Sequence, residues 1–81
     1  PFNVNTKIPV HLGQEGDVEL VIYDLLGNRI MNVVHHRLKT GDHFINWDGK
    51  DHFGNYVPSG IYPYTLKLGQ ISKSDRMILL K

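Results

Sequence analysis

Apolar and polar residues alternate with a period of two along most of the chain, and glycine-rich turns interrupt the alternation. This period is typical of β-strands that bury one face, and no window shows the 3.6-residue period of a helix. The clearest case is the segment 60–68, where the side chains of Tyr62, Tyr64, Leu66 and Leu68 are predicted to point inward. The six predicted strands are Thr6–Leu12, Val18–Asp24, Arg29–Leu38, Gly41–Asp48, Gly60–Leu68 and Ile71–Leu80.

Two of these strands indicate their own place in a sheet. Val18–Asp24 is apolar on both faces, as expected of a central strand that is covered on both sides. Pro9 cannot donate a ladder hydrogen bond, so the first strand is expected to have a free edge or a bulge.

Leu25–Asn28 is predicted to form a hairpin turn, because its last two residues, glycine and asparagine, tolerate positive φ. With a short seventh strand near Tyr56–Val57, the pattern predicts an all-β antiparallel sandwich or barrel.

Size and composition limit what such a fold can do. The chain has 81 residues and a net charge of +1, so one domain is expected, without the basic excess that nucleic-acid binding needs. A domain of this size buries only about 60–65% of its unfolded surface, which leaves little room for a closed active site. No apolar run approaches the roughly 20 residues of a membrane-spanning helix. No signal peptide opens the chain, and its abrupt start at Pro1 indicates a piece excised from a longer polypeptide.

The segment 46–60, "NWDGKDHFGNYVPSG", is the main candidate for chemistry. Asp48 and Asp51 are candidate calcium ligands, but counting an EF-hand loop from Asp48 places Lys50, a cation, at a ligand position. The favoured interpretation is that both aspartates form turns by accepting hydrogen bonds from nearby backbone N–H groups. The glycines expected to supply unusual backbone angles in this segment are Gly49, Gly54 and Gly60.

Other metal, cofactor and catalytic sites are not predicted. His35 and His36 are adjacent on a strand and point to opposite faces, whereas zinc needs three or four converging ligands. The chain has no cysteine, so neither a disulfide nor a cysteine nucleophile is available. It also lacks the G-x-S-x-G and phosphate-loop motifs. We therefore expect a protein without a cofactor that is not an enzyme.

Aromatic residues cluster around the same segment, and they allow two interpretations. Exposed rings could stack on sugars, whereas buried rings would form the core; the core is favoured because large aromatics dominate burial in small domains. Trp47 and Tyr62 are predicted to pack across two sheets. The clustered aromatics are Phe44, Trp47, Phe53, Tyr56, Tyr62 and Tyr64.

Several motifs occur in an order that resembles a known family over essentially the whole chain. They are similar to the type A C-terminal sorting domain of proteins exported by the type IX secretion system. They are also similar to the related immunoglobulin-like domain of the flagellar hook-capping protein. Two departures are the arginine of Arg76–Met77, where a lysine is common, and Pro63 within a strand. The residues that carry the resemblance are Pro1–Phe2–Asn3, Val21, Ile22, Tyr23, Asp24, Gly27, Trp47, Asp48, Gly49, Asp51, Gly54, Ser59, Gly60, Ile61, Tyr62 and Met77–Lys81.

The resemblance implies an immunoglobulin-like antiparallel β-sandwich of about seven strands that acts as a non-catalytic sorting signal. It would direct an upstream cargo domain of the same chain through the type IX translocon, with sortase components as further partners. The location would be the periplasm first, then the surface or exterior of a Gram-negative bacterium. The last strand is the expected handle, since an edge strand offers unpaired backbone groups. The candidate recognition residues are Lys73, Arg76, Met77, Ile78, Leu79, Leu80 and Lys81.

Alternatives stay open both for the charges of the last strand and for the function of the domain. The cations along the last strand would suit an acidic partner, but they would also protect an edge strand from aggregation. The domain as a whole could instead be a structural or accessory module of an extracellular multidomain protein, as in the hook-capping relative. A glycan-binding module is the other possibility, and it requires Trp47, Tyr56 and Tyr62 to be exposed and coplanar.

Overall fold

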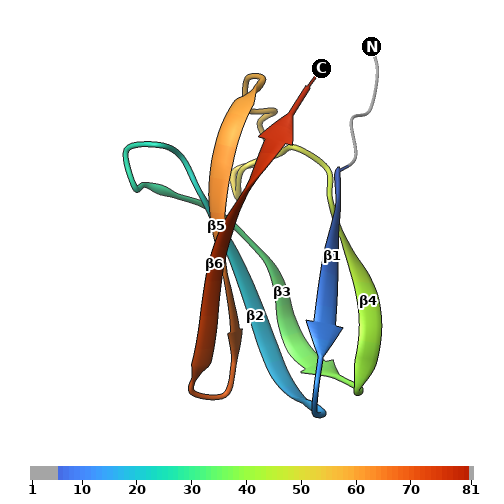
Figure 1. The fold of residues 1–81 in the computed structure, drawn as a ribbon. Helices are drawn as coiled ribbons and strands as arrows, with labels where there is room; N and C mark the ends of the chain where they lie inside the picture. The colour runs from blue at the N-terminus through green and yellow to red at the C-terminus, as the bar shows by residue number, and fades with distance from the viewer. Residues whose placement is uncertain (1–5, 81) are drawn as a thin grey trace.

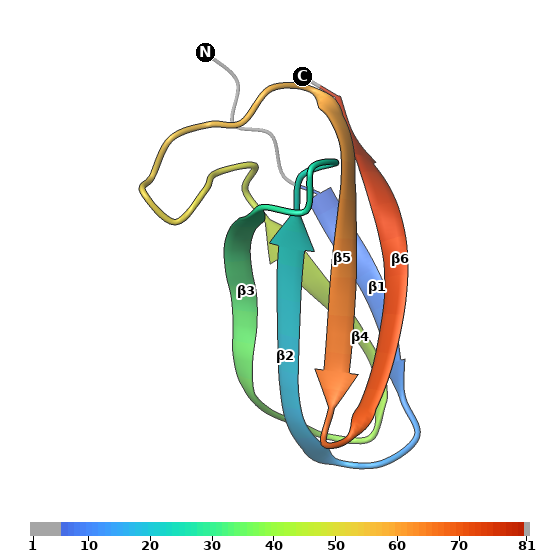
Figure 2. The same ribbon diagram turned by 90° about the vertical axis from the view of Figure 1, so that its left-hand side faces the viewer.

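The fold is an antiparallel β-sandwich, seen in a computed structural model that describes residues 6–80, apart from the side chains of residues 34 and 35. Within this range there are two antiparallel sheets, one of two strands in the order β1-β4 and one of four in the order β3-β2-β5-β6. The sheets face each other as two layers (Figures 1 and 2). The predicted fold class is confirmed. The strands are β1 (Thr6–Leu12), β2 (Gly16–Tyr23), β3 (Arg29–Leu38), β4 (Gly41–Trp47), β5 (Gly60–Leu68) and β6 (Ile71–Leu79).

The strand bounds follow the apolar alternation closely. The predicted bounds of β1, β3 and β5 agree with the structure, and β4 and β6 each end one residue earlier than predicted. β2 begins two residues earlier and ends one residue earlier than the predicted Val18–Asp24. An isolated bridge between Lys50 and Tyr56 lies where the short seventh strand was expected. The described residues form no helix long and apolar enough to cross a membrane. The opening tripeptide Pro1–Phe2–Asn3 and the terminal Lys81 lie outside the described range.

The core lies between the two sheets, and one aromatic pair packs across it. Trp47 of β4 and Tyr62 of β5 meet edge to face, with ring centroids 5.3 Å apart and an angle of 71° between the ring planes. The predicted packing of these two side chains across the sheets is therefore confirmed. Buried apolar side chains surround the pair; all but Val57, which lies in the β4–β5 connection, come from alternate positions of the strands. They include Ile8, Val10, Leu12, Val18, Leu20, Ile22, Ile45, Val57, Met77 and Leu79.

The positions of β2 and of the two strand prolines agree with their sequences. β2 lies between β3 and β5, and Val21, on the face away from the main core, is also buried. β1 pairs only with β4 among the described strands, so Pro9 lies in a strand with a free edge, as predicted. Pro63 leaves β5 continuous, but the β2–β5 ladder ends at Ile22 and Tyr64, one residue short of Pro63. Because proline has no N–H to donate, the ladder cannot continue through it.

Replacing Trp47 by alanine should lower the free energy of unfolding by about 3–5 kcal/mol, because it removes a large buried side chain and leaves a cavity. Trp47 is 1% exposed, whereas Phe44, three residues earlier on β4, is 72% exposed. Phe44→Ala is therefore the matched control and should change stability by less than about 0.5 kcal/mol. Urea denaturation followed by circular dichroism measures both. Equal losses in the two variants would contradict the assignment of Trp47 to the core.

Candidate functional site

Two turns of the same sequence type lie at one end of the sandwich. Residues 24–28 read D-L-L-G-N and join β2 to β3, and residues 51–55 read D-H-F-G-N within the β4–β5 connection. Both project at the upper end in Figure 1. The backbone N–H of His52 donates to the carbonyl of Ile30, with 3.1 Å between nitrogen and oxygen, and so ties the second turn to β3. This similarity is visible in the sequence, but it is too short to stand out as an internal repeat.

Asp24 organises the first turn. Its Oδ1 accepts hydrogen bonds from the backbone N–H groups of Leu26, at 2.9 Å, and Asn28, at 2.8 Å. Its Oδ2 accepts a third from the Asn28 side chain at 3.0 Å. Gly27 adopts a φ of 87°, a left-handed conformation that favours glycine. The hydrogen bonds from Asn28, first its side chain and then its backbone, lower the pKa of the Asp24 carboxyl.

Asp51 repeats this geometry in the second turn. Its Oδ1 accepts from the backbone N–H groups of Phe53 and Asn55, each at 3.0 Å. The N–H of Asp51 donates to the carbonyl of Asn55 at 2.9 Å, and Gly54 has a φ of 86°. Each turn is thus a small hydrogen-bonded unit that presents its second and third side chains to solvent.

The calcium candidates serve as turn residues. Asp48 accepts the backbone N–H of Lys50 at 3.1 Å, and Asp51 accepts two N–H groups as described above. Their predicted role in turns is confirmed. Within the part of the chain that the structure describes, no group of three or more carboxylate or histidine side chains converges as a metal site would require.

The aromatic rings that were proposed to stack on sugars do not form an exposed surface together. Trp47 and Tyr62 are 1% and 6% exposed, so the glycan-binding hypothesis, which requires both at the surface, loses its main support. The alternative that all the clustered aromatics form the core is wrong in part, because Phe44, Phe53 and Tyr56 are exposed. Phe44 lies on the outer face of β4, whereas Phe53 and Tyr56 lie in the long loop. There the His52 ring packs edge to face on Phe53, with centroids 4.4 Å apart, and the Lys50 ammonium lies 4.9 Å from the centroid of the Tyr56 ring.

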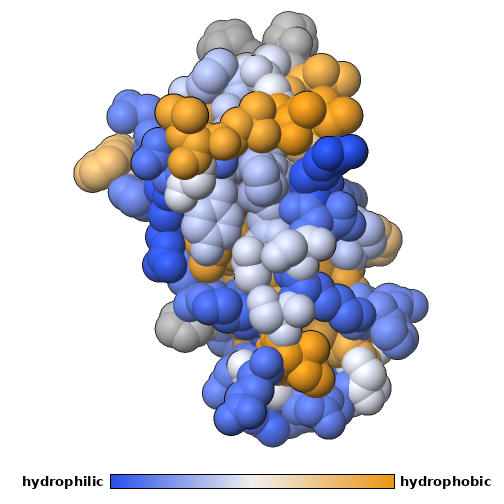
Figure 3. Space-filling view, turned by 60° about the vertical axis from the view of Figure 1, so that its left-hand side comes forward, coloured by the Kyte–Doolittle hydropathy of each residue, from blue (hydrophilic) through white to orange (hydrophobic). Residues whose placement is uncertain are grey.

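A continuous apolar area on the outer side of the four-stranded sheet is the candidate functional site. Ile61 and Ile78 are cross-strand partners on β5 and β6, and both point away from the core. The β2–β3 turn, which carries two exposed leucines, lies close to the upper end of β5 (Figure 2), and Leu26 is 88% exposed. Figure 3 shows the area as an orange band across the upper part of this face. We call it the end patch, and it comprises Leu25, Leu26, Ile61, Ile78 and Leu80.

The largest exposed apolar patch of a typical soluble monomer covers about 300–600 Å² and is often functional. The end patch contains five large aliphatic side chains that are each at least 40% exposed, which amounts to apolar surface on the order of 500 Å². The sequence showed these residues as apolar, but the alternation alone does not reveal that turn and strand residues gather at one place.

The predicted recognition residues of the last strand divide into two groups. Met77 and Leu79 are buried and belong to the core, so their role is structural. Ile78 and Leu80 belong to the end patch, and Lys73 and Arg76 are exposed elsewhere on β6. Lys81 lies outside the described residues.

These features define a class of protein: a small immunoglobulin-like β-sandwich with an exposed apolar patch at one end. The sequence model of the FlgD immunoglobulin-like domain matches residues 5–72. The chain therefore belongs to the family of FlgD immunoglobulin-like domains. No curated protein sequence matches it.

Solved structures show the same fold. The crystal structure of FlgD from P. aeruginosa matches with a TM-score of 0.74 and 23% sequence identity, covering 93% of this chain and 59% of that one. FlgD from Xanthomonas campestris, described in connection with hook capping in flagellar assembly, matches with a TM-score of 0.73 and 22% identity. That match covers 95% of this chain and 56% of the other. The present chain thus spans somewhat more than half of each.

The family match corrects one interpretation of the sequence and confirms another. The resemblance to the hook-capping immunoglobulin-like domain is confirmed, but the type IX sorting function is wrong, since the family found over residues 5–72 is that of FlgD. The translocon and sortase partners, and the cargo interpretation that accompanied them, are wrong for the same reason. The motif residues led to this error because most of them build turns and core, as Asp24, Trp47 and Tyr62 do, and such residues report a fold.

Asp24 should make folding stability depend on pH. Its pKa is lowered in the folded protein, so its contribution is present above the ordinary aspartate pKa of about 3.9 and is lost as the pH falls through the folded-state value. In Asp24→Asn, which keeps an acceptor oxygen but loses the charge, this acid-sensitive part should disappear. Urea unfolding at about pH 6 and about pH 3 measures the difference. Asp17→Asn, an exposed carboxylate outside the turns, is the control; identical pH dependence in both variants would contradict the assignment.

Proposed function

We propose that this domain is a non-catalytic structural module that helps to build or cap a larger extracellular assembly, as a hook-capping protein does. The observation that carries the proposal is the family match over residues 5–72. For FlgD from Xanthomonas campestris, hook capping is described as essential for flagellar assembly, and the same kind of work is proposed for this chain.

The surface of the domain supports such a role. An assembly module needs a rigid body and a contact area, and it needs no enclosed cavity. The two Asp-x-x-Gly-Asn turns fix the backbone at one end of the sandwich through side-chain caps. The end patch includes the two leucines of the first turn and is wholly aliphatic, as expected of the desolvated centre of a protein interface.

A double substitution in the end patch tests the proposal in the bacterium that encodes the chain. Leu26→Asp with Ile78→Asp should strongly reduce the number of hooks, because two charges in the patch oppose its desolvation by a partner. Electron microscopy of the cell surface counts the hooks, and immunoblotting shows whether hook subunits escape into the medium. Both residues are exposed, so the variant is expected to fold.

Lys67→Asp is the matched control, because it also introduces a carboxylate at an exposed position of the same sheet face, at the other end of β5. It should leave hook numbers unchanged. A folded double variant with the normal number of hooks would overturn the role of the end patch. An encoding organism that builds no flagellar hook would overturn hook capping itself.

A further inference from the structure

β6 is the open edge of the four-stranded sheet. It pairs with β5 along its whole length, from Ile71 to Leu79, and has no strand on its other side among the described residues. Figure 1 shows it as the red strand in front of the sandwich. An exposed edge of nine residues offers a row of backbone groups to another strand, and proteins usually protect such edges with charge.

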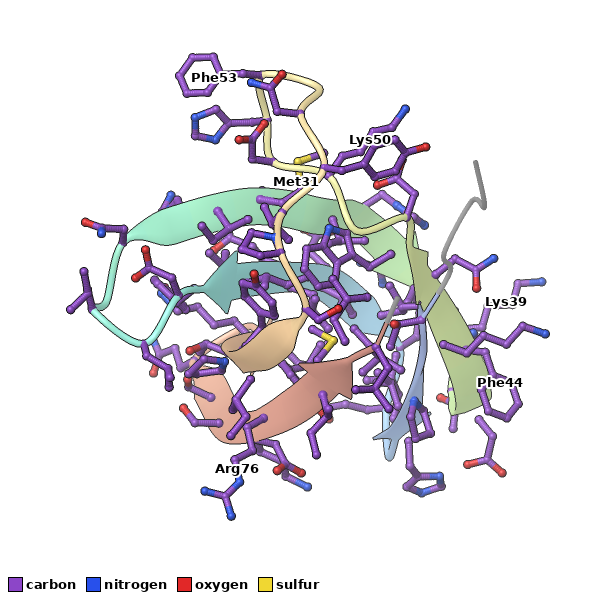
Figure 4. All side chains as sticks on the ribbon, turned by 90° about the horizontal axis from the view of Figure 1, so that it is seen from above. Met31, Lys39, Phe44, Lys50, Phe53 and Arg76 are labelled. Carbon is purple, nitrogen blue, oxygen red and sulfur yellow. The ribbon has the colours of Figure 1, made fainter. Side chains whose placement is uncertain are left out.

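β6 carries two opposite charges on one of its faces. Lys73 and Asp75 are two residues apart and therefore lie on the same face of the strand, and both are exposed. Ser74, between them, is small and lies on the opposite face. Arg76 shares the face of Ser74 and points away from the sandwich in Figure 4. The carboxylate of Asp75 accepts the backbone N–H of Arg76 at 2.8 Å, which occupies one donor of the strand.

We propose that β6 pairs with β6 of a second copy of this chain, antiparallel and centred on Ser74. In this register each Lys73 lies directly opposite the partner's Asp75, so the two-fold axis creates two ion pairs. The ladder runs from Ile71 to Met77 on both strands and joins two four-stranded sheets into one of eight strands. Such a contact is isologous, because the same surface is used by both copies.

The charges select this register over its neighbours. An antiparallel pairing centred on Lys73, Asp75 or Arg76 would place two like charges directly opposite each other, which is unfavourable. Pairing centred on Met77 would set Asp75 opposite Leu79. Centring on Ile78 would leave a shorter ladder, because β6 ends at Leu79. Only the register centred on Ser74 both satisfies the charges and uses most of the strand.

The space beside the edge accommodates the partner's side chains. A groove of about 230 Å³ lies between β1 and the β5–β6 hairpin, and Val10, Tyr64, Leu66, Lys73 and Asp75 are among its lining residues. The aliphatic stem of the incoming lysine can lie along this groove while its ammonium group reaches Asp75. When the two copies pair, the Asp75 carboxylate loses its hydrogen bond from the Arg76 N–H and forms an ion pair with the partner's lysine instead. The Arg76 N–H then becomes available for the new ladder. The pairing rests on β6 alone and does not depend on the proposed assembly role.

Complementary charge changes test the register. Lys73→Asp alone and Asp75→Lys alone each turn two attractive pairs into two repulsive ones, so each should weaken self-association by about tenfold or more. An equimolar mixture of the two variants should form a heterodimer, since every charged position then faces its opposite. Sedimentation velocity over a concentration series measures self-association, and native mass spectrometry identifies the heterodimer. Circular dichroism verifies that both variants fold.

A neutral variant separates this proposal from simple edge protection. If Lys73 and Asp75 only prevent aggregation, Lys73→Ser with Asp75→Ser should associate more than the wild type. If they select a partner, it should associate less. A wild-type chain that stays monomeric throughout the concentration series would overturn the proposal, as would single variants that dimerise like the wild type or a mixture that forms no heterodimer.

Discussion

The contact between Trp47 and Tyr62 is the interaction on which the two-layer structure depends. β1 and β4 form a sheet of only two strands, and such a pair is marginally stable by itself. It is held by burying one face against the larger sheet, and Trp47 is among the largest fully buried side chains. The polar atoms of the pair are also used, since the Trp47 indole N–H donates to the carbonyl of Lys50 and the Tyr62 hydroxyl to that of Pro58.

These two hydrogen bonds connect the core to the long loop. Lys50 and Pro58 lie near the two ends of the β4–β5 connection, so the core fixes the loop at both sides. Between them, Asp51 closes a turn that has the same geometry as the Asp24 turn. Because the aspartate, glycine and asparagine provide the hydrogen bonds and the left-handed backbone, the two middle positions are free to carry apolar side chains. Leu26 and Phe53 can therefore lie in solvent at these positions without disturbing the fold.

The sequence was sufficient for the strands and the turns because their determinants are local. A period of two identifies a strand, and aspartate followed by glycine and asparagine identifies a turn, without knowledge of the rest of the chain. Exposure is different, because it depends on what lies opposite. Phe44 is apolar and lies on a strand, but no other described segment covers its face of the two-stranded sheet. The burial of Trp47 and the exposure of Phe44 follow from the way the two sheets pack together. The alternation of residues along one strand does not show this packing.

The same distinction explains why the motif residues predicted the fold correctly but the function incorrectly. Asp24, Gly27, Trp47 and Tyr62 are needed by any sandwich with these turns and this core, so families with different partners can share them. Partner choice depends on side chains on which folding makes little demand. The contacts proposed for the end patch and for the charges along β6 use side chains of this kind. A chain can therefore keep its motif residues while its surface changes, and its function must be inferred from the exposed residues together with the family.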